Sequence, residues 1–343
     1  MNTVKVANEA NSFSLERAAK NPIMYARPNN HWESHYVLNA GALYLEGRVH
    51  LLYRAIGQSG LSVLGYAASS DGIHFYERAN EPAYICRGLG SNMGEPKSPS
   101  YRYSSGGGFG GCEDPRLTKI DDTIYMTYTA FNLGGPPPGV ALTSIAVNDF
   151  LKQRWHWQKP VLISPKQEIH KNWVIFPEKI KNKFALLHSI SPDILVDYFD
   201  TLNFTENVHI KSHYSATCRN EHWDSWVRGV GPPPIKTAEG WLVLYHAMDQ
   251  KDPDKYKIGA MILDEHDPEK ILHRSRAPIL GPDVSYENEG FKAGVIYTCG
   301  AVLLNGKLYV YYGGADTVIC VATIDLENLL TQIKHSQLSS GKS

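Results

Sequence analysis

The chain has 343 residues, 43% hydrophobic and 20% charged, which is ordinary for a globular protein with a full core. The net charge of -1 excludes broad electrostatic capture of nucleic acid or an anionic membrane. The sequence lacks both a signal-peptide-like start and a stretch near the roughly 20 apolar residues of a membrane span, so a cytoplasmic location is expected. Five cysteines without metal-type spacing predict neither a metal site nor a disulfide framework.

A short alternating apolar strand occurs five times along the chain. In every copy, a strand and a turn containing Gly, Asp or Asn come before it and a second alternating strand follows. The five copies end at Tyr53, Tyr128, His188, Tyr245 and Tyr312. This repeat, without any long helical pattern, predicts an all-β fold and, within it, a five-bladed β-propeller; a β-sandwich is the alternative.

The repeat also predicts the domain organisation. Residues 1–38 are expected to form an N-terminal extension packed on the propeller, residues 39–330 the catalytic propeller, and residues 331–343 a C-terminal tail. Mostly polar or small residues directly follow the five repeated strands, where a purely structural strand would continue with apolar ones. We therefore expect them to line a pocket at the central axis. They are Arg54, Thr129, Ser189, His246 and Gly313.

The segment Gly111-Cys112-Glu113-Asp114-Pro115-Arg116 is the first candidate for chemistry. It precedes an alternating run, Leu117–Tyr128, that predicts strand. Because proline restricts the residue before it, the backbone of Asp114 is expected to be extended and rigid. A carboxylate fixed in this way suits general acid catalysis. The alternative is a structural turn, in which Asp114 caps backbone amides and Arg116 pairs with a neighbour.

Two further clusters surround the middle repeats. Lys171 precedes Asn172 and Trp173; the lysine either binds an anion or sugar hydroxyl or is solvated, and the tryptophan is either a sugar-stacking platform or core. Residues 219–228 place Glu221 and Asp224 beside two tryptophans, which is typical of carbohydrate recognition or of a well-packed loop.

A last cluster, residues 286–292, precedes the fifth repeat. It offers Glu287 as another carboxylate, either for chemistry or for a structural contact.

Four motifs, GCEDPR, FPEKI with LLHS, GPPPIKTAEGWLVLYH, and CGAVLL with YYGGAD, together resemble glycoside hydrolase family 130 between about residues 39 and 330. That family contains β-mannoside phosphorylases and β-1,2-mannosidases on a five-bladed propeller. The resemblance implies that Asp114 is the general acid, directly or through a substrate hydroxyl, supported by Arg116. It also implies substrate or phosphate contacts at Arg54, Lys171 and His246. We further expect Asn172, Trp173, Arg228 and Asp316 to contact substrate.

Two positions depart from the family pattern. The arginine usual after LLH is Ser189, and the lysine before GxGPPP aligns with Val227, next to Arg228. Losing two of about four cations weakens a phosphate site, since charge-assisted contacts supply most of its binding. Hydrolysis with inversion of a β-mannoside is therefore the leading hypothesis. Water then needs a carboxylate base opposite Asp114. The candidates are Glu221, Asp224 and Glu287.

The alternative is a β-mannoside phosphorylase that releases mannose 1-phosphate, with phosphate held by Arg54, Lys171, Arg228 and His246. A third hypothesis is a non-catalytic carbohydrate-binding propeller. The expected partner is an oligosaccharide or small glycoside, without nucleic acid or membrane, and a homo-oligomer is left open. No cofactor is expected, apart from inorganic phosphate as co-substrate of a phosphorylase.

Overall fold

The computed structural model describes residues 14–86, 110–132, 137–204, 209–212 and 222–338. Twenty strands and three helices lie in these ranges, so the fold is all-β, as predicted. None of the helices found there has the length and apolar character needed to cross a membrane.

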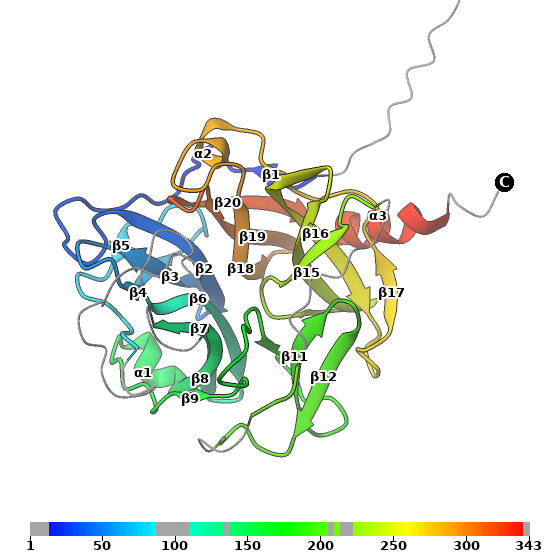
Figure 1. Ribbon diagram of the computed structural model, residues 1–343, viewed down its shortest axis with the longest axis horizontal. Coiled ribbons are helices and arrows are strands. Elements are labelled where there is room, and N and C mark those ends of the chain that lie inside the picture. The colour runs from blue at the N-terminus through cyan, green and yellow to red at the C-terminus, as the bar shows by residue number, and fades with distance from the viewer. Residues whose placement is uncertain (1–13, 87–109, 133–136, 205–208, 213–221, 339–343) are drawn as a thin grey trace, which may run out of the picture.

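The strands form five antiparallel units that follow one another around the middle of the molecule (Figure 1). Unit one contains β2 (Tyr36–Leu45), β3 (Arg48–Ile56), β4 (Ser62–Ser69) and β5 (Glu77–Arg78). Unit two contains β6 (Gly110–Ile120), β7 (Thr123–Asn132), β8 (Gly139–Ala146) and β9 (Val161–Leu162), with α1 (Val147–Leu151) after β8. Unit three contains β10 (Val174–Ile175), β11 (Phe184–Ile190) and β12 (Ile194–Phe199).

Unit four contains β13 (Trp226–Val230), β14 (Ile235–Thr237), β15 (Gly240–Asp249), β16 (Asp252–Leu263) and β17 (Ile271–Arg274). Unit five contains β18 (Ile296–Leu304), β19 (Lys307–Gly314) and β20 (Val318–Asp325), and β1 (Glu16–Arg17) pairs with β20. The remaining helices are α2 (Ser285–Asn288) and α3 (Leu326–Leu338).

The predicted repeat is confirmed at the level of strands. The five repeated segments are β3, β7, β11, β15 and β19, and each lies between two antiparallel neighbours. Backbone hydrogen bonds group the described strands into four sheets, because one parallel pair, Ser62 with Gly111, joins units one and two. The sheet pairing therefore leaves the five-bladed propeller as a prediction.

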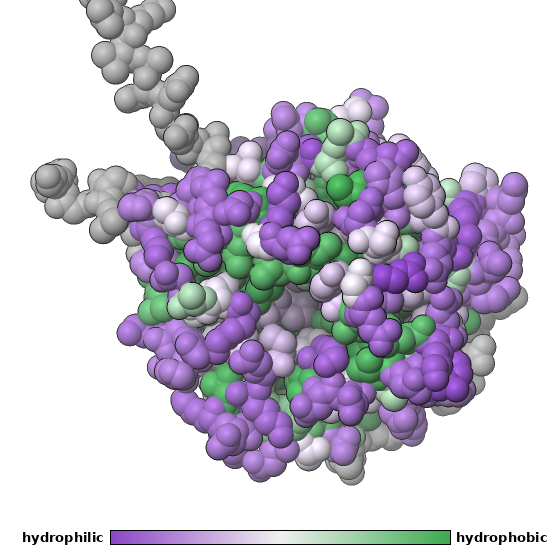
Figure 2. Space-filling view, turned by 180° about the vertical axis from the view of Figure 1, so that it is seen from behind, coloured by the Kyte–Doolittle hydropathy of each residue, from purple (hydrophilic) through white to green (hydrophobic). Residues whose placement is uncertain are grey.

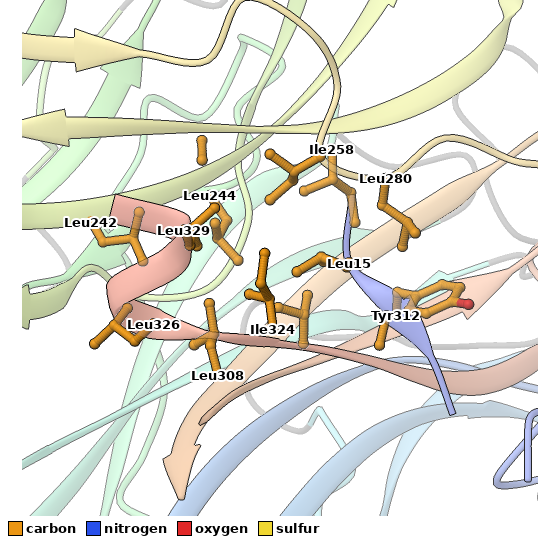
Figure 3. Close-up of a cluster of buried hydrophobic side chains, with 14 of the residues drawn as sticks. Leu15, Leu242, Leu244, Ile258, Leu280, Leu308, Tyr312, Ile324, Leu326 and Leu329 are labelled. Atoms are coloured by element: carbon orange, nitrogen blue, oxygen red, sulfur yellow. The ribbon is translucent and has the colours of Figure 1, made fainter. Parts of the chain in front are cut away.

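Both chain ends contribute to the core between units four and five. Leu15 packs there with leucines of β15 and with Leu326 and Leu329 of α3 (Figure 3). Ile333, later in the same helix, is fully buried in this cluster. The expected boundary between residues 330 and 331 thus falls inside α3, and the one between residues 38 and 39 falls inside β2.

The first strands of units one, two, four and five contain irregularities at equivalent places. Register shifts occur between Leu38 and Gly41, Glu113 and Arg116, Val227 and Gly229, and Thr298 and Gly300. Such bulges re-aim side chains and accumulate beside active sites.

The bulge in β6 corrects the expected geometry of Asp114. The φ angle of Asp114 is 54°, which is left-handed and not extended, and the EDPR segment lies within β6, not at its entrance. The bulge also accommodates Pro115, which cannot donate a ladder hydrogen bond.

Units one and two approach each other closely beside this bulge. A Cβ atom on Gly41 would lie 2.5 Å from the carbonyl oxygen of Pro115, so only glycine fits at this position of β2. The surface seen from behind is hollowed near the centre of the molecule (Figure 2).

Candidate active site

Asp114 is the centre of a buried polar cluster. Its side chain accepts a 2.8 Å hydrogen bond from Nδ2 of Asn39, and Nη1 of Arg54 lies 3.5 Å from the same carboxylate oxygen. Burial by itself raises the pKa of this carboxyl, but the positive charges of Arg54, Arg116 and Lys171 outweigh that effect and lower the pKa. Asp114 is therefore an anion held by cations in the protein without substrate.

Arg54 and Glu113 form the buried ion pair beside Asp114. Nη2 of Arg54 donates to Oε1 of Glu113 at 2.8 Å, and Nε of Arg54 donates to the Ser62 hydroxyl at 2.9 Å. Nζ of Lys171 lies 3.5 Å from the other oxygen of Glu113. The arginine and the glutamate are 1% exposed or less, whereas Lys171 is partly exposed, so the lysine is the cation of this group that solvent reaches.

Arg116 and Asn172 brace the opposite side of the cluster. The Arg116 guanidinium donates to the carbonyl oxygens of Asp114 at 2.7 Å and Gly231 at 2.9 Å, and to Oδ1 of Asn172 at 2.8 Å. Asn172 is left-handed, with a φ of 66°, and its Nδ2 donates to the carbonyl oxygen of Arg228 at 3.0 Å. Arg116 thus fixes the backbone of the bulge, and Asn172 connects units two, three and four.

His246 is fully buried against Tyr297, with ring centroids 3.9 Å apart and an interplanar angle of 9°. Its Nε2 accepts a 2.9 Å hydrogen bond from the backbone N–H of Thr298. Burial, helped by the charge of Arg116, lowers its pKa to about 3. His246 is consequently a neutral imidazole at physiological pH.

Asp316 is a second acid in the same cluster. It is 6% exposed and has a left-handed backbone, with a φ of 52°. Burial raises the pKa of Asp316 to about 6, against the opposing charges of Lys292 and Arg54. The negative charges of Asp114 and Glu113 raise the pKa further, which places Asp316 beside them.

The two positions that depart from the family pattern are occupied by structural residues. The Ser189 hydroxyl donates to the carbonyl oxygens of Ser191 and Asp193, and Val227 is 4% exposed within a hydrophobic cluster. The neighbour of Val227, Arg228, extends away from that cluster and donates from Nε to the Tyr256 hydroxyl at 3.0 Å. Arg228 thus points to the other face of the strand from Val227, as the alternation of side chains along a strand predicts.

The two described candidate bases, Asp224 and Glu287, have hydrogen-bond partners outside this cluster. Glu287 is fully buried, accepts two 2.8 Å hydrogen bonds from Arg17 and one from Tyr312, and accepts further hydrogen bonds from the backbone N–H groups of Asp283 and Val284 before α2. Asp224 accepts a hydrogen bond from Tyr245 at 2.9 Å. These partners indicate structural roles for both carboxylates, and Glu221 lies outside the described residues.

Trp173 lies among the core residues of units two and three. It is 1% exposed, and its ring packs against His170 and His188. This burial favours a core role for Trp173 over a sugar-stacking role, because a ring that stacks on a sugar needs an exposed face.

Sequence reasoning missed several members of the cluster, notably Asn39, Tyr297 and the role of Glu113 as ion-pair partner. A signal existed for Asn39. It lies 75 positions before Asp114, and the same spacing separates the repeated residues Tyr53 and Tyr128. Within the described ranges, no group of three or more His, Cys, Asp or Glu side chains is placed to hold a metal ion.

Comparisons with known proteins identify the family of the chain. Residues 3–335 match the family profile of glycoside hydrolase family 130, described as β-1,4-mannooligosaccharide phosphorylase. A 1,2-β-oligomannan phosphorylase of Thermoanaerobacter sp. (strain X514) is 36% identical, with 92% of this chain and 99% of the relative covered. A β-1,2-mannobiose phosphorylase of the same organism is 35% identical, with the same coverage.

A solved structure shows the same similarity. β-1,2-Mannobiose phosphorylase from Listeria innocua, in complex with β-1,2-mannobiose, superposes with a TM-score of 0.69 at 25% identity, covering 94% of this chain and 99% of that one. The family profile and the two relatives span nearly the whole chain, so the chain belongs to glycoside hydrolase family 130.

Proposed function

We propose that this protein is a β-mannoside phosphorylase that cleaves β-1,2-linked manno-oligosaccharides with inorganic phosphate and releases mannose 1-phosphate. The observation that carries the proposal is the set of cations, Arg54, Arg116 and Lys171, gathered around the buried carboxylate of Asp114. The two relatives that are 35% and 36% identical are phosphorylases of β-1,2-linked mannosides, which supports the same substrate class here.

The five antiparallel units support a five-bladed propeller as the scaffold of this site. The first strands of units one, two, four and five carry their irregularities at equivalent places. We infer that these bulges face the central axis, where Asn39, Asp114 and Gly229 meet residues of the other units.

The cluster fits inverting phosphorolysis. A phosphate oxygen attacks the anomeric carbon, the new C–O bond forms as the glycosidic C–O bond breaks, and the leaving oxygen takes a proton. Asp114 gives this proton directly or through a sugar hydroxyl. In the protein without phosphate its pKa is low, which suits an anion. A phosphate dianion bound nearby offsets the positive charges that lower this pKa. It therefore raises the pKa of Asp114 and favours the protonated carboxyl.

Hydrolysis is the second candidate, favoured by Ser189 and Val227 at positions where the family pattern has cations. It requires a base, and the described candidates Asp224 and Glu287 are held by structural partners. This makes hydrolysis the weaker proposal.

The test is to incubate the protein with β-1,2-mannobiose and β-1,2-mannotriose, with and without inorganic phosphate, and to identify products by NMR. Mannose 1-phosphate that forms only with phosphate is the expected result; free mannose at the same rate without phosphate would establish hydrolysis instead. Asp114→Asn should lower turnover by about 10²–10⁴-fold. Asp121→Asn, an exposed and likewise left-handed aspartate in the β6–β7 turn, is the matched control.

A further inference from the structure

Two cations contact one tyrosine beside the cluster. Nε of Arg228 donates to the Tyr256 hydroxyl at 3.0 Å, and the guanidinium carbon lies 5.9 Å from the centroid of the same ring. Nζ of Lys292 lies 5.1 Å from that centroid. A tyrosine ring attracts cations through its π face, so the side chains of Arg228 and Lys292 are both held against Tyr256.

These cations are connected to the residues around Asp114 from two sides. The carbonyl oxygen of Arg228 accepts a hydrogen bond from Asn172, which itself accepts one from Arg116. Of the groups that lower the pKa of Asp316, the positively charged Lys292 has the largest effect, so it lies near that carboxyl.

The backbone of Lys292 is fixed on the same side. Its N–H donates to the carbonyl oxygen of Ala315 at 2.9 Å, directly before Asp316. The Tyr256 ring also lies 6.4 Å from the ring of Tyr297, which stacks on His246. The pair therefore borders the cluster on the side of units four and five.

We propose that Arg228 and Lys292, which both contact Tyr256, form the phosphate-binding pair of this protein. This inference rests on the proposed function and names the side chains that replace the cations absent at Ser189 and Val227. Both side chains can bind phosphate. The arginine guanidinium donates paired hydrogen bonds to two phosphate oxygens, and the lysine ammonium attracts phosphate as a point charge.

The exposure of these side chains agrees with the role. Lys292 is exposed and Arg228 and Tyr256 are half-buried, whereas Arg54 and Arg116 are buried beneath. Phosphate can thus reach the pair from solvent.

The charge balance points the same way. Around Asp114 and Asp316 the positive charges of Arg54, Arg116, Lys171 and Lys292 outnumber the carboxylates, and Arg228 adds a fifth cation beside Tyr256. The carboxylates are Glu113, Asp114 and Asp316.

The experiment compares Lys292→Ala, Arg228→Gln and Arg228→Lys with the unmodified protein. Calorimetric titration with inorganic phosphate measures binding, and initial rates give separate KM values for phosphate and for β-1,2-mannobiose. Each neutral variant should weaken phosphate binding about tenfold or more, because one charge-assisted contact is lost, while the KM for mannobiose stays within about twofold. Arg228→Lys keeps the positive charge but loses the paired N–H donors of the guanidinium. Its phosphate affinity should therefore lie between those of the unmodified protein and Arg228→Gln.

Lys270→Ala removes the same charge from an exposed lysine between β16 and β17 and should change neither constant. Mannose 1-phosphate formation with an unchanged phosphate affinity in both neutral variants would overturn the pair and leave the proposed function standing. Phosphate-independent release of mannose by the unmodified protein would overturn the proposed function. Failure of phosphate to bind the unmodified protein in the calorimeter would overturn the pair as well.

Discussion

Asn39 and Asp114 occupy equivalent bulges in the first strands of neighbouring units, and the side-chain amide of Asn39 donates a 2.8 Å hydrogen bond to the carboxylate of Asp114. Both backbones are left-handed, with φ angles of 50° and 54°. Asparagine and aspartate tolerate this region better than most residues, which explains how two successive units accommodate the same distortion.

Asn39→Ala should raise the pKa of Asp114, because the lost hydrogen bond stabilises the ionised form. A general acid works only while protonated, so the alkaline limb of the pH–rate profile should move to higher pH. The lost orientation should lower kcat by about tenfold or more. Asn39→Gly removes the same side chain without straining the left-handed backbone, so it should share the pH shift and lose less stability. An unmoved alkaline limb in both variants would contradict the role of Asn39.

Arg54→Met should destabilise the protein by about 3–5 kcal/mol, because it removes the buried partner of Glu113 and leaves only the partly exposed Lys171 to balance Glu113 and Asp114. Urea unfolding measures the change. The double variant Arg54→Met with Glu113→Gln should recover part of this loss, since the uncompensated charge is removed, but should stay inactive. If the stability loss of the double variant equals the sum of the losses in Arg54→Met and Glu113→Gln, the two side chains are not energetically coupled.

Gly41→Ala should shift the bulge that holds Asp114. The new Cβ atom would lie 2.5 Å from the carbonyl oxygen of Pro115, and a backbone atom cannot give way cheaply. We expect a loss of about 1–3 kcal/mol in stability and about 10²-fold in kcat, as for a misplacement near 1 Å. Gly281→Ala is the control, because its nearest neighbour, a methylene of Lys257, is 3.7 Å away. Equal kcat values for the two alanine variants would show that the contact does not position Asp114.

The strands were predictable from sequence because their signals are local. Alternating apolar residues and Gly, Asp or Asn turns identified all five repeated strands, from β3 to β19. The bulges were not predictable in this way. The proline rule indicates an extended Asp114, but this residue lies in a bulge and is left-handed, with its carbonyl oxygen bound by Arg116.

The site could be predicted only in part, for a similar reason. Asp114 and its nearest cations lie in recognisable motifs, whereas the partners of Glu287 and Asp224 come from other segments of the chain. Arg17 is 270 residues from Glu287 in sequence, and no local pattern indicates that contact. The Arg228–Tyr256–Lys292 arrangement depends on packing between segments in the same way.

Asp316 should make the stability of the protein depend on pH. Its pKa is raised from 3.8 to about 6 in the folded protein, mainly by burial. The neutral carboxyl is therefore favoured on folding; this contribution is complete below about pH 3.8 and is lost as the pH rises through 6. Asp316→Asn cannot ionise, so its stability relative to the unmodified protein should increase between pH 4 and pH 7 by on the order of 2 kcal/mol. Urea unfolding at pH 4.5, 6 and 8 measures this difference, with the exposed Asp121→Asn as control. A difference that is constant across the three pH values would show that Asp316 ionises as readily in the folded chain as in the unfolded one.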